Sequence, residues 1–180
     1  MARCRWLGSL VVACSLAFAA GCTPHGAGTK AAALPASDHP LSGAPAPGFE
    51  LQSASGSQSA SPGTYAGRVV LVDFWATWCE PCRASFPHYQ SLLNQYGNKL
   101  AVIGVSEDDD HIGIDNFGSE TGAQFPLVWD GDKSVAERYQ IKGMPTLFII
   151  DQNGLVRFVH SGFFRGDEAR ISAAVDSLLQ

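Results

Sequence analysis

The sequence lacks the features that mark several common classes of protein. It contains no internal repeat, no long block of like charge and no surplus of basic residues, since 12 Lys and Arg are outnumbered by 17 Asp and Glu. Nucleic acid is therefore not an expected partner, because its phosphates are held mainly by Lys and Arg. No apolar run reaches the length of about 20 residues needed to cross a bilayer, which argues against a permanent transmembrane helix.

Cysteine is too scarce, and too unevenly placed, to staple the fold. Three of the 5 cysteines lie within the first 22 residues, so only Cys79 and Cys82 remain in the rest of the chain. A small secreted fold that depends on disulfides carries several pairs, and one pair closing a tiny loop restricts the unfolded chain very little. A zinc ribbon would need a second cysteine pair or clustered histidines, whereas the 5 histidines are scattered. The pair therefore indicates thiol chemistry, with metal binding as the weaker alternative.

The amino terminus is typical of an export signal. Arg3 and Arg5 precede the apolar run WLGSLVVACSLAFAA, which leads to small residues and then Cys22. The sequence AAGC resembles the lipobox of bacterial lipoproteins, in which the signal is cut before the cysteine and the cysteine carries the lipid. The alternative is an ordinary signal peptide cut nearby, with Cys22 left as a free thiol. We favour lipidation, because a lone exposed thiol is a liability in an oxidising compartment.

These features divide the chain into three parts. Residues 1–21 are predicted to be a signal peptide, residues 22–46 a lipidated cysteine with a flexible linker, and residues 47–180 a single domain. The linker is predicted from its abundance of Ala, Gly, Pro and Ser, and the domain from a length that suits one core. We expect an exported protein in the periplasm or on the outer face of the membrane, anchored through the lipid on Cys22.

The domain alternates between segments typical of strands and segments typical of helices. An Asn-Gly pair at 153–154 predicts a hairpin turn between the last two strands. The acidic run at 107–110 is interpreted as the solvated start of a helix. This order predicts an α/β fold with a mixed sheet. The expected strands are 68–76, 99–106, 125–129, 145–151 and 155–162, and the expected helices are 81–96, 109–120, 133–141 and 167–179.

The two cysteines have the spacing of a dithiol that opens and closes reversibly. Cys79 is expected at the mouth of a helix, where unpaired N–H groups and the helix dipole favour its thiolate. Cys82 lies one helical turn further on, within the Cα separation that a disulfide tolerates. Attack by Cys79 on a partner's disulfide would give a mixed disulfide, which Cys82 would resolve.

The sequence LVDFWATWCEPC, residues 71–82, resembles the active-site strand and helix of the thioredoxin fold. More narrowly, it resembles the exported, membrane-tethered TlpA/ResA-like thiol-disulfide oxidoreductases, over residues 46–180 and with a second motif, GMPT, at 143–146. The resemblance implies a mixed central sheet flanked by helices, with an N-terminal extension and a central helical insertion. It also implies that no diffusible cofactor is needed, because the redox group is the cysteine pair itself.

A substrate-binding region follows from the same resemblance. In the family the proline of the second motif is cis and faces the cysteines, which assigns this role to Pro145. The carbonyl and N–H of Met144 are then free to pair with an extended substrate segment. Trp78, Glu80 and Pro81 beside the sulfurs complete the predicted contacts, Trp78 through apolar surface. The alternative for Pro145 is a proline that merely opens a strand.

Asp73 interrupts an apolar run, so a buried carboxylate there requires an explanation. In thioredoxin an aspartate at the matching position of VDFW relays protons to and from the second cysteine, whereas many TlpA-like proteins have asparagine. Burial should raise the pKa of Asp73, which suits a base for Cys82. The alternative is an aspartate at a strand end, bonded to backbone N–H groups. ResA-like proteins carry a glutamate after the second strand, to which Glu107 or Asp109 could correspond, and Ser85 replaces a glutamate that is frequent in the family.

The residues between the cysteines indicate the direction of electron flow. Glu80 places a negative charge that opposes thiolate formation, and no histidine stabilises the thiolate, which favours a reductant. The resemblance implies a membrane thiol reductase of the DsbD or CcdA type as donor and extracytoplasmic disulfide proteins as acceptors, with apocytochrome c as the first to test. A monomer is expected.

Two other functions share parts of this pattern. A peroxiredoxin-like peroxidase would need a threonine three residues before its cysteine, and Thr77 lies only two before Cys79. A copper chaperone would use Cys79, Cys82 and a soft ligand such as Met144.

Overall fold

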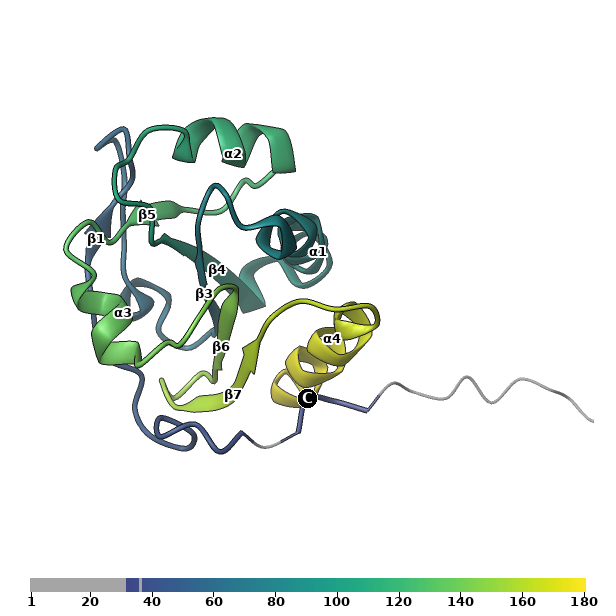
Figure 1. Ribbon diagram of the computed structural model, residues 1–180. Helices are drawn as coiled ribbons and strands as arrows, with labels where there is room; N and C mark the ends of the chain where they lie inside the picture. The colour runs from purple at the N-terminus through teal and green to yellow at the C-terminus, as the bar shows by residue number, and fades with distance from the viewer. Residues whose placement is uncertain (1–31, 36) are drawn as a thin grey trace, which may run out of the picture.

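The computed structural model describes residues 32–35 and 37–180 and has a five-stranded mixed sheet at its centre (Figure 1). The predicted signal peptide and Cys22 lie outside the described residues. The strands are β1 (Leu51–Gln52), β2 (Ser59–Ala60), β3 (Val69–Trp75), β4 (Leu100–Ser106), β5 (Leu127–Trp129), β6 (Thr146–Ile150) and β7 (Val156–Ser161). The helices are α1 (Glu80–Tyr96), α2 (Ile114–Thr121), α3 (Ser134–Tyr139) and α4 (Asp167–Leu178), with short 3-10 helices η1 (Pro62–Tyr65) and η2 (Gly97–Lys99).

The sheet has the order β5-β4-β3-β6-β7, with β3 at its centre. β3 runs parallel to β4 and antiparallel to β6, and β4 pairs with β5 in parallel while β6 and β7 form the predicted hairpin. All seven residues of β3 are buried, because the sheet is covered on both faces. The predicted α/β fold with a mixed central sheet and flanking helices is confirmed.

Alternate residues of β3 pack into two separate cores, because side chains of a strand point to opposite faces. Leu71 and Trp75 belong to the cluster formed with α1, α2 and α4, whereas Val72 and Phe74 belong to the cluster formed with α3. Figure 1 shows α1 and α4 on one side of the sheet and α3 on the other. This alternation directs Asp73 to the same side as α1.

Helix α1 begins and ends where the sequence indicates. Pro81 lies in the first turn, where its missing N–H costs no helical hydrogen bond. Gly97 follows the last residue with a φ of 54°, in the left-handed region that glycine adopts without steric cost. The helix therefore presents its amino terminus directly after β3, with Cys79 as the capping residue.

Helix α2 starts later than predicted, and the acidic run at 107–110 is not a helix start. The helix begins at Ile114, after Gly113 with a φ of 89°. Asp108 is buried and accepts hydrogen bonds from Thr77 and Ser106, which hold the segment in a loop. The interpretation of this run as a solvated helix start was therefore wrong.

The predicted flexible linker of residues 22–46 does not extend to residue 46, because ordered structure begins before residue 47. The backbone of Gly43 donates to the carbonyl of Val156, and the backbone of Ala46 donates to the carbonyl of Gly154, each within 2.9 Å. Leu34 is only 4% exposed and belongs to the core cluster under α1 and α4. None of the described helices combines the length and the hydrophobicity of a membrane span.

Candidate active site

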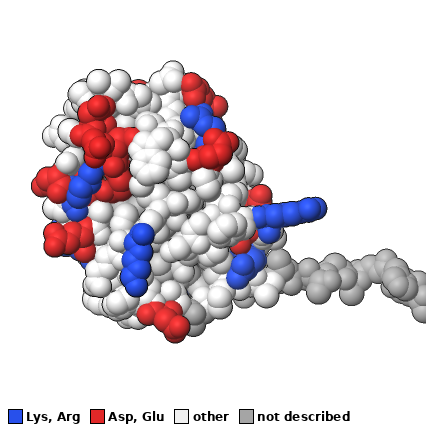
Figure 2. All heavy atoms as spheres, viewed as in Figure 1, with Lys and Arg blue, Asp and Glu red and all other residues white. Residues whose placement is uncertain are grey.

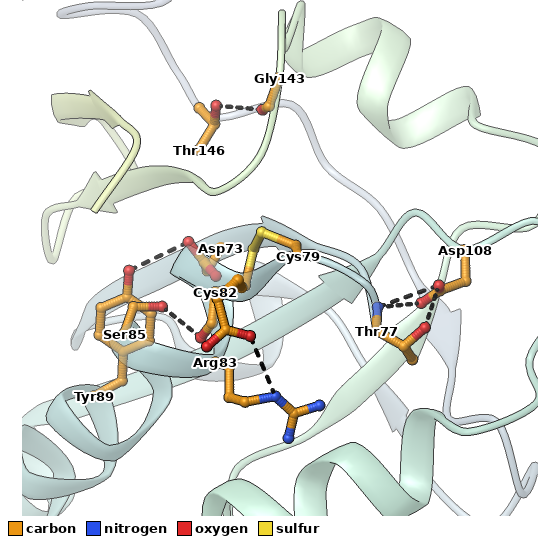
Figure 3. Close-up of a disulfide and its surroundings, with 11 residues drawn as sticks. Asp73, Thr77, Cys79, Cys82, Arg83, Ser85, Tyr89, Asp108, Gly143 and Thr146 are labelled. Carbon is orange, nitrogen blue, oxygen red and sulfur yellow. Dashed lines mark hydrogen bonds and ion pairs between the residues drawn. A yellow bond between two sulfur atoms is a disulfide. The ribbon is translucent and has the colours of Figure 1, made fainter. Parts of the chain in front are cut away.

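Cys79 and Cys82 form a disulfide at the amino terminus of α1 (Figure 3). Their Cα atoms are 5.3 Å apart, which is an ordinary separation for a disulfide. The carbonyl of Cys79 accepts hydrogen bonds from the N–H groups of Cys82 at 3.1 Å and Arg83 at 3.2 Å, so the first turn of the helix fixes both cysteines. Cys79 is 5% exposed and Cys82 is fully buried, so an attacking partner reaches Cys79 first.

The predicted contact residues around the disulfide differ in exposure. The side chain of Trp78 projects from the surface with 72% of its area exposed, and Glu80 and Pro81 are also exposed. Trp75, in contrast, is fully buried and packs against the rings of Phe86 and Phe117. Trp78 is therefore available to a partner.

The Met144–Pro145 peptide bond is cis, as predicted. Thr146 pairs with Phe74 near the end of β3, which places residues 143–146 at the same edge of the sheet as the cysteine loop. The hydroxyl of Thr146 donates to the carbonyl of Gly143 at 2.7 Å and stabilises the turn, which lies across from the disulfide in Figure 3. Pro145 is buried and Met144 is half-buried against the core cluster that contains both cysteines.

Asp73 is fully buried, and its carboxyl group meets one hydroxyl. The phenolic O–H of Tyr89 donates to Asp73 Oδ1 at 3.3 Å, and Asp73 Oδ2 has no hydrogen-bond partner in the described structure. Burial raises the pKa of Asp73 well above its ordinary value, and the bond from Tyr89 offsets part of this rise. The alternative of a carboxylate held by backbone N–H groups at a strand end does not match, because Asp73 lies within β3 and its partner is Tyr89.

The loop that enters Cys79 is held by Asp108, which the sequence did not identify. Its carboxylate accepts hydrogen bonds from the backbone N–H of Thr77 at 3.0 Å and from the Thr77 hydroxyl at 2.8 Å. Its backbone carbonyl accepts from Trp129 Nε1 at 2.9 Å and Lys133 Nζ at 2.6 Å. Asp108 thereby ties the cysteine loop to the ends of β4 and β5. Its position just after β4 could have indicated this contact. Because β3 and β4 are parallel, the residues that follow them, Thr77 and Asp108, meet at the same edge of the sheet.

The two candidates for a second acid lie in the loop that follows β4. Glu107 is half-buried beside Asp130 and Lys133, and burial followed by the charge of Asp130 raises the pKa of Glu107 to about 8. Asp109 is exposed. Among the described residues neither forms a hydrogen bond with a cysteine. In the same part of the chain, no group of three or more His, Cys, Asp or Glu is placed to hold a metal ion.

Three large apolar side chains are exposed in the described structure: Trp78, Ile112 and Phe164. Ile112 and Trp78 line one cleft together with the acidic segment 108–110. Phe164 lies against Gly162, whose N–H donates to the carbonyl of Pro145 at 2.8 Å. The sequence did not indicate that Ile112 and Phe164 would be exposed, because a single apolar residue in a loop belongs to no periodic pattern.

Charge is unevenly distributed over the surface. Figure 2 shows the largest group of acidic side chains at the left of the viewed face and further acidic side chains at its upper right and lower edge, with scattered basic side chains and an uncharged stretch in the middle. Arg83 donates to Glu120 at 2.7 Å and lies 4.6 Å from the centre of the Phe117 ring, so it links α1 to α2.

A dithiol at the start of the helix that follows the central strand, opposite a cis-proline, defines the chain as a thioredoxin-fold thiol-disulfide oxidoreductase. The chain belongs to the AhpC/TSA family, whose model matches residues 42–159.

Similarity to individual proteins identifies the part of the family to which the chain is related. The chain is 34% identical to the thioredoxin-like protein YneN of Bacillus subtilis over 123 residues, covering 67% of this chain and 71% of the relative. It is 33% identical to the thiol-disulfide oxidoreductase ResA of the same organism over 124 residues, or 67% of each chain. A crystal structure from Chlorobium tepidum, assigned as a thiol:disulfide interchange protein DsbE, has a TM-score of 0.72 at 33% identity, covering 77% of this chain and 98% of that one. The predicted ResA-like family and enzyme class are confirmed.

Proposed function

We propose that the protein reduces disulfide bonds of extracytoplasmic proteins with the Cys79–Cys82 dithiol. The observation that carries the proposal is the difference between the two cysteines: Cys79 caps α1 and keeps 5% of its surface exposed, while Cys82 is fully buried on the side of the sheet that holds Asp73. Disulfide exchange requires an accessible attacking cysteine and a protected resolving cysteine, and Cys79 and Cys82 fit these two roles.

The reaction proceeds in two exchanges. The thiolate of Cys79 attacks one sulfur of the substrate disulfide, the substrate S–S bond breaks, and the released sulfur takes up a proton. Cys82 then gives its proton to the carboxylate of Asp73 and attacks the Cys79 sulfur. The mixed disulfide breaks, the second substrate thiol leaves, and the Cys79–Cys82 bond forms. Two electrons pass from the dithiol to the substrate.

Asp73 is suited to this proton transfer. A carboxyl group with an ordinary pKa would be a weak base for a thiol, whereas the burial of Asp73 raises its pKa towards that of cysteine. The same group can return the proton when the disulfide is reduced again.

The docking surface is proposed to combine backbone pairing with apolar contact. An extended substrate segment would pair with the main chain of Met144, next to Pro145, and cover Trp78. Glu80 and Pro81 would border the segment on the helix side. Because Phe164 and Ile112 are exposed near these contacts, they would extend the apolar surface on both sides.

Electron flow and cellular location rest on the sequence. Glu80, 89% exposed in its side chain, disfavours an unusually stable Cys79 thiolate and therefore a strongly oxidising disulfide. We propose export by residues 1–21 and a lipid on Cys22, followed by a linker that ends before the segment in which Leu34, Gly43 and Ala46 contact the domain. The proposed partners are a DsbD- or CcdA-type membrane protein as electron donor and a disulfide-containing acceptor such as apocytochrome c. In this proposal the protein acts as a monomer and needs no diffusible cofactor.

A peroxidase is disfavoured by the hydrogen bonds of Thr77, whose hydroxyl donates to Asp108. Equilibrium dialysis with Cu(I) addresses the copper-chaperone alternative, which requires tight binding through Cys79 and Cys82.

The proposal is tested by incubating the reduced protein with a disulfide-containing protein such as oxidised insulin. We expect the wild type to reduce it, Cys79→Ser to be inactive, and Cys82→Ser to accumulate a mixed disulfide through Cys79. Accumulation of a mixed disulfide through Cys82 in the Cys79→Ser variant, or full activity of either variant, would contradict the assigned roles. The Cys82→Ser variant expressed in the native host would then trap the physiological substrates.

A further inference from the structure

The only hydrogen bond of the Asp73 carboxyl group in the described structure comes from Tyr89, on the helix α1 that packs against β3. Tyr89 lies on α1, two turns beyond Cys82, and its ring is 1% exposed. Its hydroxyl donates to Asp73 Oδ1 at 3.3 Å. Figure 3 shows the Asp73 side chain between the Tyr89 hydroxyl and the cysteine pair.

The other described neighbours of Asp73 supply no alternative hydrogen-bond partner for its carboxyl group. The neighbours of Asp73 across the sheet are Gly104 on β4 and Leu147 on β6, which carry neither a charge nor a side-chain donor. On α1, the Ser85 hydroxyl donates to the carbonyl of Cys82 at 3.0 Å. Among the described residues, Tyr89 is therefore the hydrogen-bond donor that can fix the orientation of the Asp73 carboxyl group.

We propose that Tyr89 is the positioning residue for Asp73, holding Oδ1 so that Oδ2 remains free to exchange a proton with Cys82. This inference rests on the proposed role of Asp73 as the proton acceptor. A buried carboxyl oxygen without a partner is costly and therefore calls for an explanation. In this arrangement Oδ1 anchors the carboxyl group to Tyr89, and Oδ2 exchanges the proton.

Tyr89 also acts on the charge of Asp73. A donor to a carboxylate stabilises its ionised form, so the bond from Tyr89 lowers the pKa of Asp73 against the larger effect of burial. The pKa of Tyr89 itself is raised by burial and by the charges of Asp73 and Asp167, so the phenol keeps its proton. Asp167, on α4, is in turn paired with His160 and Arg170. Removal of the phenolic hydroxyl would raise the pKa of Asp73 further.

Ellman's reagent separates the two thiol steps of the reduced protein. Attack by Cys79 releases the first thionitrobenzoate, and resolution by Cys82 releases the second. We expect Tyr89→Phe to leave the first release unchanged and to shift the pH profile of the second upwards by at least about half a pH unit, which corresponds to a rate about threefold lower below the midpoint. Asp73→Asn should slow the second release at least about a hundredfold, the lower end of the usual range for loss of a general base.

Two further variants distinguish positioning from packing. Tyr139 is equally buried, in the other core, and its hydroxyl has no partner in the described structure, so Tyr139→Phe should leave the profile unchanged. In an Asp73→Asn background, Tyr89→Phe should cause no additional shift. An unshifted profile in Tyr89→Phe with a slow Asp73→Asn would overturn the role of Tyr89, as would a similar shift in Tyr139→Phe. A second release unaffected by Asp73→Asn would instead overturn the proton transfer on which the inference rests.

Discussion

Thr77 and Asp108 are joined by both the backbone N–H and the hydroxyl of Thr77, at 3.0 and 2.8 Å from the Asp108 carboxylate. Thr77 precedes Cys79 by two residues, and Asp108 follows the neighbouring strand β4. The position of the attacking sulfur relative to the sheet therefore depends on a contact between two loops.

We predict that Asp108→Ala destabilises the protein by about 2–3 kcal/mol, because it removes several hydrogen bonds to a buried carboxylate. It should also alter the rate at which iodoacetamide alkylates Cys79 in the reduced protein. Urea unfolding and alkylation kinetics measure the two effects. Asp109→Ala, which removes an exposed neighbouring acid, is the matched control and should unfold within about 0.5 kcal/mol of the wild type. Equal stabilities for the two variants would show that the Asp108 contacts do not hold the loop.

Glu107 should make stability fall as the pH rises. The folded protein keeps the Glu107 proton up to a pKa of about 8, whereas the unfolded chain releases it near 4.5. The folded state therefore binds more protons between these values, and the free energy of unfolding decreases through this window. We expect Glu107→Gln to flatten this part of the pH profile and to be relatively more stable at its upper end. An unchanged slope in urea unfolding at several pH values would refute the elevated pKa.

Phe164 offers a test of the docking surface. We expect Phe164→Ser to lower kcat/KM for a protein disulfide about tenfold, as the loss of an apolar anchor worth more than 1 kcal/mol would. The reaction with Ellman's reagent, which is too small to cover Phe164, should remain unchanged and serves as the internal control. Equal losses with both substrates would indicate damage to the disulfide site rather than to docking.

Cys22 tests the proposed anchor independently of the domain. We predict that Cys22→Ser moves the exported protein from the membrane fraction to the soluble fraction, while the thiol chemistry of the purified protein stays the same. Cell fractionation with immunoblotting measures the distribution. Persistence of the variant in the membrane fraction would mean that another segment supplies the attachment.

The sequence predicted the parts of the site that depend on local spacing. Cys79 and Cys82 are three residues apart and follow an apolar strand, so their place at the start of α1 follows from the order of the segments. The same sequence did not reveal the partners that meet only in the folded core. Tyr89 reads as one more apolar position of an amphipathic helix, and its contact with Asp73 depends on how α1 lies across the sheet.

For the acidic run at 107–110, the sequence led to a wrong prediction rather than to a missing one. Its composition suggested a solvated helix start, because charge patterns do not reveal which single carboxylate will be buried. Asp108 is recruited by Thr77 and Ser106, one from the adjacent strand connection and one from its own strand end. Burial of a charged group of this kind depends on donors that converge in three dimensions.

The reduction potential of the Cys79–Cys82 couple tests the direction of electron flow most directly. The purified protein would be equilibrated with defined ratios of reduced and oxidised dithiothreitol or glutathione, and the free thiols counted by mass spectrometry after alkylation. A reductant should give a potential closer to the about −270 mV of thioredoxin than to the about −120 mV of a strong periplasmic oxidant. A value near −120 mV would reverse the assignment and make the protein a donor of disulfides.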